Sequence, residues 1–166
     1  MLIRPIQPDD SREFLTMLLE LDKETTFMMY EPGERLENIE VMRERITNIM
    51  KNKDLTLLAI SDDHIVGFLS AERGRPNRIQ HTAYVVTGIR KAYQGMGIGT
   101  SLFQELDKWA VENHITRLEL TVMCPNTIAK HLYEKNGFKV EGKKEKAMLV
   151  NNDYVDEYYM AKLYNH

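Results

Sequence analysis

The stretch Gln94-Gly95-Met96-Gly97-Ile98-Gly99 stands between a strand-like segment and a segment with helical periodicity. Glycine lets the backbone approach a ligand closely, and the first turn of a helix presents amides that have no partner within the helix. The positive end of the helix dipole adds to the attraction for an anion. The stretch therefore predicts either a pyrophosphate-binding loop or a plain tight turn.

Two other phosphate-binding loops fit these glycines poorly. A Rossmann loop follows the first strand of its sheet and needs an acidic residue about 20 positions downstream, whereas here four strand-like segments precede the loop. A P-loop ends in Gly-Lys-Ser/Thr, and Gly99-Thr100-Ser101 contains no lysine. Both dinucleotide and P-loop nucleotide binding are therefore disfavoured.

Segments on both sides of the loop read as strands and helices. Runs rich in β-branched and aromatic residues predict strands at 2–7, 55–60, 65–71, 81–89, 118–122, 138–140, 147–150 and 154–163. Helical spacing of apolar residues predicts helices at 12–21, 36–51, directly after the glycine loop, and at 126–136. Strand 81–89, the loop, its helix and strand 118–122 form a βαβ unit, so we expect these two strands to be parallel.

Composition excludes several classes of protein. The 166 residues carry a net charge of −3, and Lys and Arg are scattered, so no nucleic-acid partner is expected. No run of about 20 apolar residues occurs, so no membrane partner is expected either. The single cysteine, Cys124, excludes an internal disulfide and fits a reducing, cytoplasmic location. We expect it to be a buried or bystander thiol.

Two motifs resemble those of the GCN5-related N-acetyltransferases, the GNAT family. Residues 89–99 are similar to the family's motif A, with Gln94, Gly97 and Gly99 at its defining positions. Residues 126–138 resemble motif B, with its Asn, Ala, Tyr and Gly-Phe residues in register. Two motifs at the correct separation make a far more specific resemblance than either one alone.

The resemblance covers nearly the whole chain, so we expect a single N-acetyltransferase domain over residues 1–166. It implies an α/β (α+β) fold: a mixed, mainly antiparallel sheet of about seven strands, splayed between the fourth and fifth, with helices on both faces. The implied activity is acetyl transfer from acetyl-CoA to a primary amine. Residues 119–122, 138–142 and 155–161 look closest to the bacterial branch that acetylates free amino acids and related small amines. Ribosomal-protein and polyamine acetyltransferases share much of the same pattern, so an amino acid or a polyamine is the expected acceptor.

By the same resemblance, one strand and the glycine loop bind acetyl-CoA, and no metal is expected. Backbone groups of Thr87, Gly88 and Ile89 are expected to bond the pantetheine arm and face the acetyl carbonyl. The amides expected to hold the pyrophosphate belong to Gln94, Gly95, Met96, Gly97, Ile98, Gly99 and Thr100. Asn126 matches the family asparagine that contacts pantetheine, and it can equally cap a helix.

Tyr133 is the expected catalytic residue, because it matches the family tyrosine near the thioester sulfur. A phenol with a pKa of about 10 can protonate a departing thiolate without itself being ionised at neutral pH. The alternative is a core tyrosine. The general base stays open, since the fourth strand offers no carboxylate at Tyr84, Val86 or Gly88. The candidates are Glu72, His81, Glu31 and water.

Other functions stay open on the sequence alone. A peptide N-terminal acetyltransferase would share the same motifs, and an acyl-CoA-binding sensor could keep the cofactor loop without turnover. Family members often pair through their C-terminal strands. The tyrosines at 154, 158, 159 and 164 supply aromatic area of the kind enriched at interfaces, so a homodimer is expected.

Overall fold

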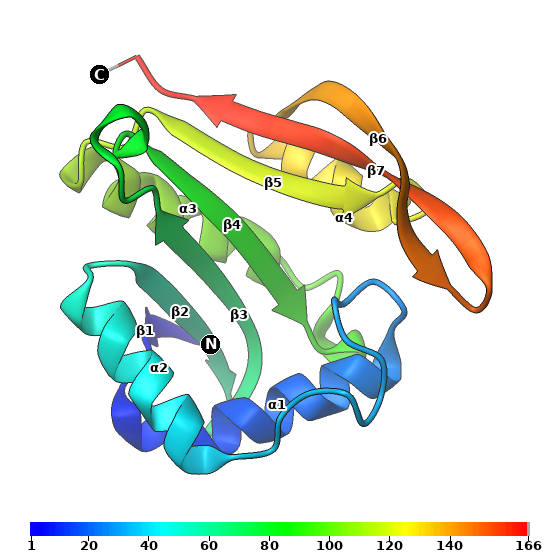
Figure 1. Ribbon diagram of the computed structural model, residues 1–166. Coiled ribbons are helices and arrows are strands. Elements are labelled where there is room, and N and C mark those ends of the chain that lie inside the picture. The colour runs from blue at the N-terminus through cyan, green and yellow to red at the C-terminus, as the bar shows by residue number, and fades with distance from the viewer. Residues whose placement is uncertain (166) are drawn as a thin grey trace. The chain divides into compact units, whose positions relative to one another are not determined.

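The computed structural model describes residues 1–165, which contain a seven-stranded sheet and four α-helices (Figure 1). The strands are β1 (Leu2–Pro5), β2 (Leu55–Ser61), β3 (His64–Arg73), β4 (Thr82–Ile89), β5 (Arg117–Met123), β6 (Lys139–Val150) and β7 (Asp153–Leu163). The helices are α1 (Ser11–Glu24), α2 (Ile39–Lys51), α3 (Ile98–Glu112) and α4 (Thr127–Lys135). The strand order is β1-β2-β3-β4-β5-β7-β6, with β4 and β5 parallel and the pairs β1/β2, β2/β3, β5/β7 and β6/β7 antiparallel. This confirms the mixed, mainly antiparallel sheet.

The described residues form two compact units, each built from two segments of the chain. The first unit contains residues 1–72 and 86–105, and the second contains residues 73–85 and the chain from Leu106 onward. Strand β4 and helix α3 each contribute residues to both units. The single domain expected from the sequence stays a prediction.

The core of the first unit forms where α1 and α2 pack on β2 and β3. Phe14 and Leu18 of α1 and Ile46 of α2 are buried with Leu58 and Phe68 of the strands. The rings of Phe14 and Phe68 meet edge to face, with centroids 5.5 Å apart. This apolar face fixes α1 and α2 on the same side of the three N-terminal strands.

Helix α2 differs in detail from the expectation. It begins at Ile39 rather than Leu36, because the Asn38 side chain caps it by accepting from the Val41 amide at 3.1 Å. Met42 and Ile46 form its buried stripe, and Met50 is exposed.

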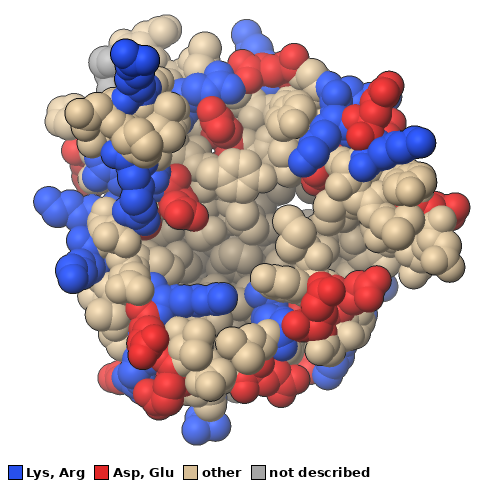
Figure 2. All heavy atoms as spheres, in the orientation of Figure 1, with Lys and Arg blue, Asp and Glu red and all other residues tan. Residues whose placement is uncertain are grey.

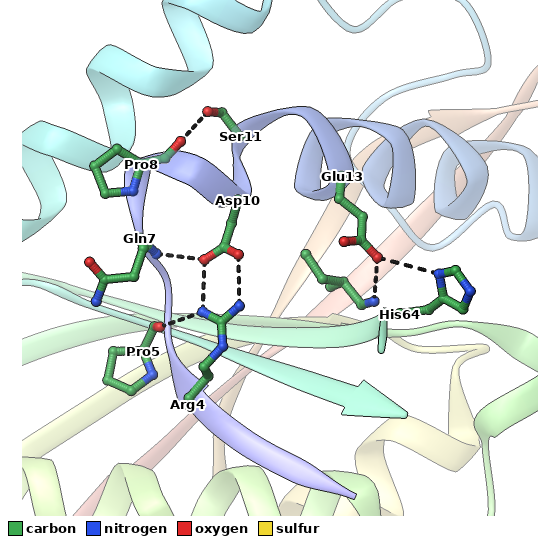
Figure 3. A network of polar contacts seen from close by, with 9 residues as sticks. Arg4, Pro5, Gln7, Pro8, Asp10, Ser11, Glu13 and His64 are labelled. Carbon is green, nitrogen blue, oxygen red and sulfur yellow. Dashed lines mark hydrogen bonds and ion pairs between the residues drawn. The ribbon is translucent and has the colours of Figure 1, made fainter. Parts of the chain in front are cut away.

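A polar network ties β1 to α1 and α1 to the β2–β3 hairpin (Figure 3). Arg4 donates to both carboxylate oxygens of Asp10 at 2.7 and 2.8 Å, and the Gln7 amide donates to the same carboxylate at 2.7 Å. The Glu13 carboxylate accepts from the Ile65 amide at 2.9 Å. Helix α1 is therefore anchored by charge as well as by its apolar face.

The second unit is built on β5, β7 and β6. Leu118, Leu120 and Val122 of β5 are buried, so the alternate residues form the opposite, polar face of the strand. The expectation of separate strands at 138–140 and 147–150 is wrong, since β6 is continuous across the charged residues between them. An edge strand tolerates such charges, because one of its sides faces solvent.

The parallel ladder between β4 and β5 is short. It joins only Thr82–Tyr84 to Arg117–Glu119, although both strands continue beyond these pairs. Because the two strands pair over only three residues each, the ladder agrees with the expected splay between the fourth and fifth strands. Helix α4 confirms the expected helix within one residue at each end.

The surface carries no extended field of one charge on the face in view, where basic and acidic side chains are interspersed (Figure 2). Uncharged side chains gather over the β6–β7 hairpin, at the right of this view. Within residues 1–165, no helix has both the length and the apolar character needed to cross a membrane.

Candidate active site

The glycine loop has the geometry of an anion cradle. Gly95 and Gly97 have φ angles of +76° and +79°, and a Cβ added at either position would meet no heavy atom within 4 Å. Helix α3 begins at Ile98, and the Ser101 amide donates a hydrogen bond to the Gly97 carbonyl at 3.1 Å. The amides before Ser101 have no partner within the helix. The Gln94 amide donates to the Lys91 carbonyl at 3.4 Å. The open space at the start of α3, where the first amides of a helix lack helical partners, fits the pyrophosphate of acetyl-CoA.

Glu24, the last residue of α1, fixes the corner that leads into this loop. Its carboxylate lies 2.5 Å from the Nε atom of Arg90 and accepts from the Lys91 amide at 2.8 Å. The Gln94 side chain donates to the Ile89 carbonyl at 3.3 Å, which closes the same corner. The end of β4 and the glycine loop are thereby held together within the first unit.

The end of β4 is closely packed. The Thr87 hydroxyl donates to the Phe68 carbonyl at 2.8 Å, so this side chain is engaged within the sheet. A Cβ at Gly88 would lie 2.9 Å from a Phe68 ring carbon and 3.0 Å from a Leu21 methyl group. Packing therefore requires glycine at position 88, whatever the strand binds.

Asn126 and Tyr133 lie on α4 in the second unit. Asn126 caps the helix, with its side-chain oxygen accepting from the Ala129 amide at 3.3 Å. Tyr133 is 7% exposed, and its ring lies 6.1 Å from that of Phe138. Burial, and to a lesser degree the neighbouring Tyr84, raise the pKa of Tyr133 well above its usual value. The phenol therefore stays protonated over the physiological pH range, as a general acid requires.

The three candidate bases occupy separate parts of the chain. Glu31 is exposed between α1 and α2, and Glu72 is exposed near the end of β3. His81 is exposed just before β4, and its backbone carbonyl accepts from the Thr116 and Arg117 amides. None of the three lines the cavity found in the second unit.

That cavity lies on the polar face of β5 and has a volume of about 300 Å³. It is lined by Tyr84, Arg117, Glu119, Leu120, Thr121, Glu141, Tyr159 and Met160, and is called the β5 cavity below. Arg117 donates to Glu119 at 2.7 Å and to both carboxylate oxygens of Glu141 at 2.5 and 3.0 Å. The hydroxyls of Tyr84 and Thr121 lie 2.9 Å apart.

Only part of this cavity could be expected from the sequence. The alternation of β5 could have placed Glu119 and Thr121 on one polar face, beside each other along the strand. Glu141 carried no such signal, because it lies in a β-bulge where β6 shifts register between Val140 and Gly142. A bulge re-aims a side chain, and here it brings the Glu141 carboxylate to Arg117.

Known proteins share this sequence pattern and fold. Residues 15–138 match the family described as "Acetyltransferase (GNAT) family". The L-amino acid N-acetyltransferase AaaT of Escherichia coli is 33% identical over 111 residues, which are 64% of this chain and 67% of that protein. An acetyltransferase of the GNAT family from Streptococcus pneumoniae is 31% identical, with a TM-score of 0.94 over 99% of each chain.

A similar fold occurs with a bound cofactor. YncA of Salmonella typhimurium, solved with its cofactor acetyl-CoA, has a TM-score of 0.89 and 16% identity, covering 100% of this chain and 95% of that chain. At this identity the likeness concerns the fold alone. The fold class and the N-acetyltransferase class expected from the sequence are confirmed by these comparisons together.

Proposed function

Because the chain belongs to the GNAT family of acetyltransferases, we propose that it transfers an acetyl group from acetyl-CoA to the primary amine of a small molecule. The observation that carries the choice of donor is the glycine loop. Gly95 and Gly97 adopt backbone angles that other residues rarely take, and they leave open space at the start of α3. A diphosphate is the group that such a loop accommodates.

The proposed roles of the residues follow from the family resemblance. Amides of residues 94–100 bind the pyrophosphate, and backbone groups of residues 87–89, with Asn126, bind and orient the pantetheine arm. When bound, acetyl-CoA supplies the acetyl thioester. The amine nitrogen bonds to the acetyl carbon as the carbon–sulfur bond breaks, and the Tyr133 hydroxyl donates its proton to the sulfur. The amine gives up a proton to a base or to water.

The acceptor class is supported by the amino-acid acetyltransferase relative and by the β5 cavity. A cavity of about 300 Å³ is at the small end of the range that ligand pockets span. A small amine fits that volume better than the several ordered residues of a peptide. A tyrosine at position 133, which matches the family tyrosine near the thioester sulfur, supports turnover over a purely cofactor-binding role.

A turnover assay over a panel of amines tests this function. Free thiol released from acetyl-CoA is measured with amino acids, diamines and short peptides, and each product is identified by mass spectrometry. We expect acetylation of at least one small amine. Acetylation of peptides alone would contradict the acceptor class, and acetyl-CoA binding without transfer to any amine would contradict the enzyme activity.

We also propose that the chain forms a homodimer through the β6–β7 hairpin. Leu149, Tyr154 and Leu163 each expose more than half of their surface there. Aromatic and apolar side chains are enriched at the buried centres of interfaces. Sedimentation at micromolar concentration is expected to give the mass of a dimer, whereas a monomer would contradict the proposal.

A further inference from the structure

The loop between α1 and α2, residues 25–38, is held to the last turn of α1 by a buried ion pair. Arg35 donates to both carboxylate oxygens of Asp22, at 2.8 and 2.9 Å. The Asp22 side chain is 1% exposed and the Arg35 side chain is 12% exposed, so the pair lies out of solvent. Breaking it would leave a buried charge without its partner, which is strongly unfavourable. The ion pair therefore keeps the loop close to α1.

The apolar side chains of this loop differ in exposure. Phe27, Met29 and Tyr30 are exposed. The Tyr30 ring lies against the guanidinium of Arg35, with 4.8 Å between the ring centroid and the Arg35 Cζ atom. Met28 is partly buried and packs against the core of the first unit. Of the four residues 27–30, only Met28 is therefore turned toward the core.

Met28 reaches the end of β4 at Gly88. Its sulfur lies 3.6 Å from the position that a Cβ of Gly88 would occupy, next to the Phe68 ring and a Leu21 methyl group. Leu21 and Phe68 are buried, so Met28 is the member of this group with surface left to contact a ligand. Figure 1 shows the loop beside this end of β4.

The backbone of β4 at Gly88 is also where the acetyl carbonyl is proposed to lie. Within residues 1–165, the ladder with β5 ends at Tyr84, so the edge of β4 at residues 87–89 is not paired with β5. A carbonyl oxygen that accepts from a strand amide lies about 2.9 Å from its nitrogen, and the acyl chain begins at the same carbonyl carbon. A chain that extends from this carbon toward Gly88 meets Met28 after about one or two added carbon atoms.

We propose that Met28 closes the acyl end of the acetyl-CoA site, so that the protein transfers acetyl in preference to longer acyl groups. This inference rests on the proposed acetyl transfer. The thioester is the same in acetyl-CoA and butyryl-CoA, so the space beyond the carbonyl has to distinguish them. A methyl group fits against the Met28 thioether, whereas a longer chain has to displace it from the core contacts behind it. The ion pair between Asp22 and Arg35 opposes that displacement, because it holds the loop to α1.

The test compares acetyl-CoA with butyryl-CoA in the wild type and in Met28→Ala. The dissociation constant of each thioester is measured by calorimetry without amine, and kcat/KM is measured with the best amine of the panel. A single methylene changes specificity by about 10- to 200-fold, so the wild type should prefer acetyl-CoA at least about tenfold. Met28→Ala removes the thioether and should reduce this preference by about tenfold in both measurements.

Met29→Ala is the matched control, because it makes the same change one residue further along the loop, where the side chain is 70% exposed. It is expected to keep the wild-type preference. Met28→Val shortens the side chain but keeps an apolar group near the backbone. It should shift the preference in the same direction as Met28→Ala, and it replaces that variant if the alanine protein does not fold.

Three results would overturn the role of Met28. They are equal use of the two thioesters by the wild type, an unchanged preference in a folded Met28 variant, and an equal shift in Met28→Ala and Met29→Ala. The last result would assign the effect to the loop as a whole. Failure to acetylate any amine would overturn the proposed function, while the dissociation constants of the two thioesters would still decide the role of Met28.

Discussion

Gly97 and Gly33 share a positive φ and an unobstructed Cβ position, but only Gly97 lies in the glycine loop. Alanine at either position pays a similar penalty for the left-handed backbone, about 1–2 kcal/mol. Only Gly97→Ala places a methyl group in the proposed pyrophosphate space. We expect it to weaken acetyl-CoA binding at least about tenfold, roughly the loss of one charge-assisted hydrogen bond. Calorimetry on both variants measures this, and equal affinities would exclude the loop as the pyrophosphate site.

Tyr133→Phe keeps the buried ring and removes only the hydroxyl. General acid catalysis contributes about 100- to 10,000-fold, so kcat should fall by at least the lower figure while acetyl-CoA affinity changes little. The measurement is kcat under conditions where chemistry limits the rate. Tyr154→Phe, on the exposed hairpin, is the control and is expected to keep wild-type kcat.

The raised pKa of Tyr133 adds a pH dependence to this prediction. The neutral phenol is the active form, so wild-type activity should show no loss from its ionisation until well above the usual tyrosine value of about 10. A loss of kcat near neutral pH that disappears in Tyr133→Phe would contradict the assignment. A wild-type kcat in the variant would leave Tyr133 as a packing residue.

Single residues differ in how far the sequence can predict them. Asn126 and Gly137 could be placed at the two ends of α4, because capping depends on local backbone geometry; Gly137 has a φ of +95°. Arg117, Glu119 and Glu141 could not be brought together, because their contacts join two strands through a bulge. A candidate base was therefore sought on the fourth strand, while the carboxylates of the cavity lie on β5 and β6.

Hydrogen bonds to the Asp10 carboxylate hold the junction between β1 and α1. Hydrogen bonds from Arg4, the larger cause, and from the Gln7 backbone lower the pKa of Asp10. A lowered carboxyl pKa stabilises the fold above the unfolded value of about 3.9, and the gain is lost as pH falls through the folded value. We expect Asp10→Asn to cost about 1–2 kcal/mol of unfolding free energy at neutral pH. The difference should vanish in strong acid, as measured by denaturant unfolding at several pH values.

The control for this junction is Asp9→Asn. The Asp9 side chain is almost fully exposed, and its carboxylate lies 3.4 Å from Arg43. Such exposed ion pairs contribute little to stability, so the free energy of unfolding should change by less than about 1 kcal/mol at any pH. Equal effects of the two variants, or a cost of Asp10→Asn that persists in acid, would contradict the charge-based anchor.

Elements with a clear hydrophobic period could be predicted from the sequence. A strand whose residues are extended only because a neighbouring strand pairs with them could not. Helix α1 could be predicted from apolar residues at helical spacing, because these residues alone form the face that packs against the sheet. The continuous strand β6 could not, since the charged residues 141–146 suggest a break. They are strand residues only because β7 pairs with β6 along most of its length.

The strand order of the whole sheet could be predicted partly from local connection rules and partly from the resemblance to the GNAT family. The parallel pairing of β4 with β5 follows from the βαβ unit around the glycine loop. The order β5-β7-β6 does not follow from periodicity. If β6 instead of β7 lay next to β5, the apolar faces of the strands would be buried equally well. The resemblance to an entire family supplied the arrangement of the sheet that local patterns leave open.

Bound acetyl-CoA should protect the residues that are proposed to contact it, which include 87–89, 94–100 and Asn126. Saturating acetyl-CoA should therefore slow amide exchange in the glycine loop and at the start of α4. A ligand at about 100 times its dissociation constant stabilises the folded state by about 2.7 kcal/mol, so the melting temperature should rise as well.

Hydrogen exchange followed by mass spectrometry resolves the glycine loop, α4 and α2 separately. Helix α2, which carries no proposed contact, is the internal control and should show only the small change that global stabilisation gives. In Gly97→Ala, protection in both regions should require a higher acetyl-CoA concentration, because both depend on the same bound molecule. Protection confined to residues 94–100 would remove Asn126 from the proposed cofactor contacts, and protection of α4 alone would contradict the pyrophosphate assignment.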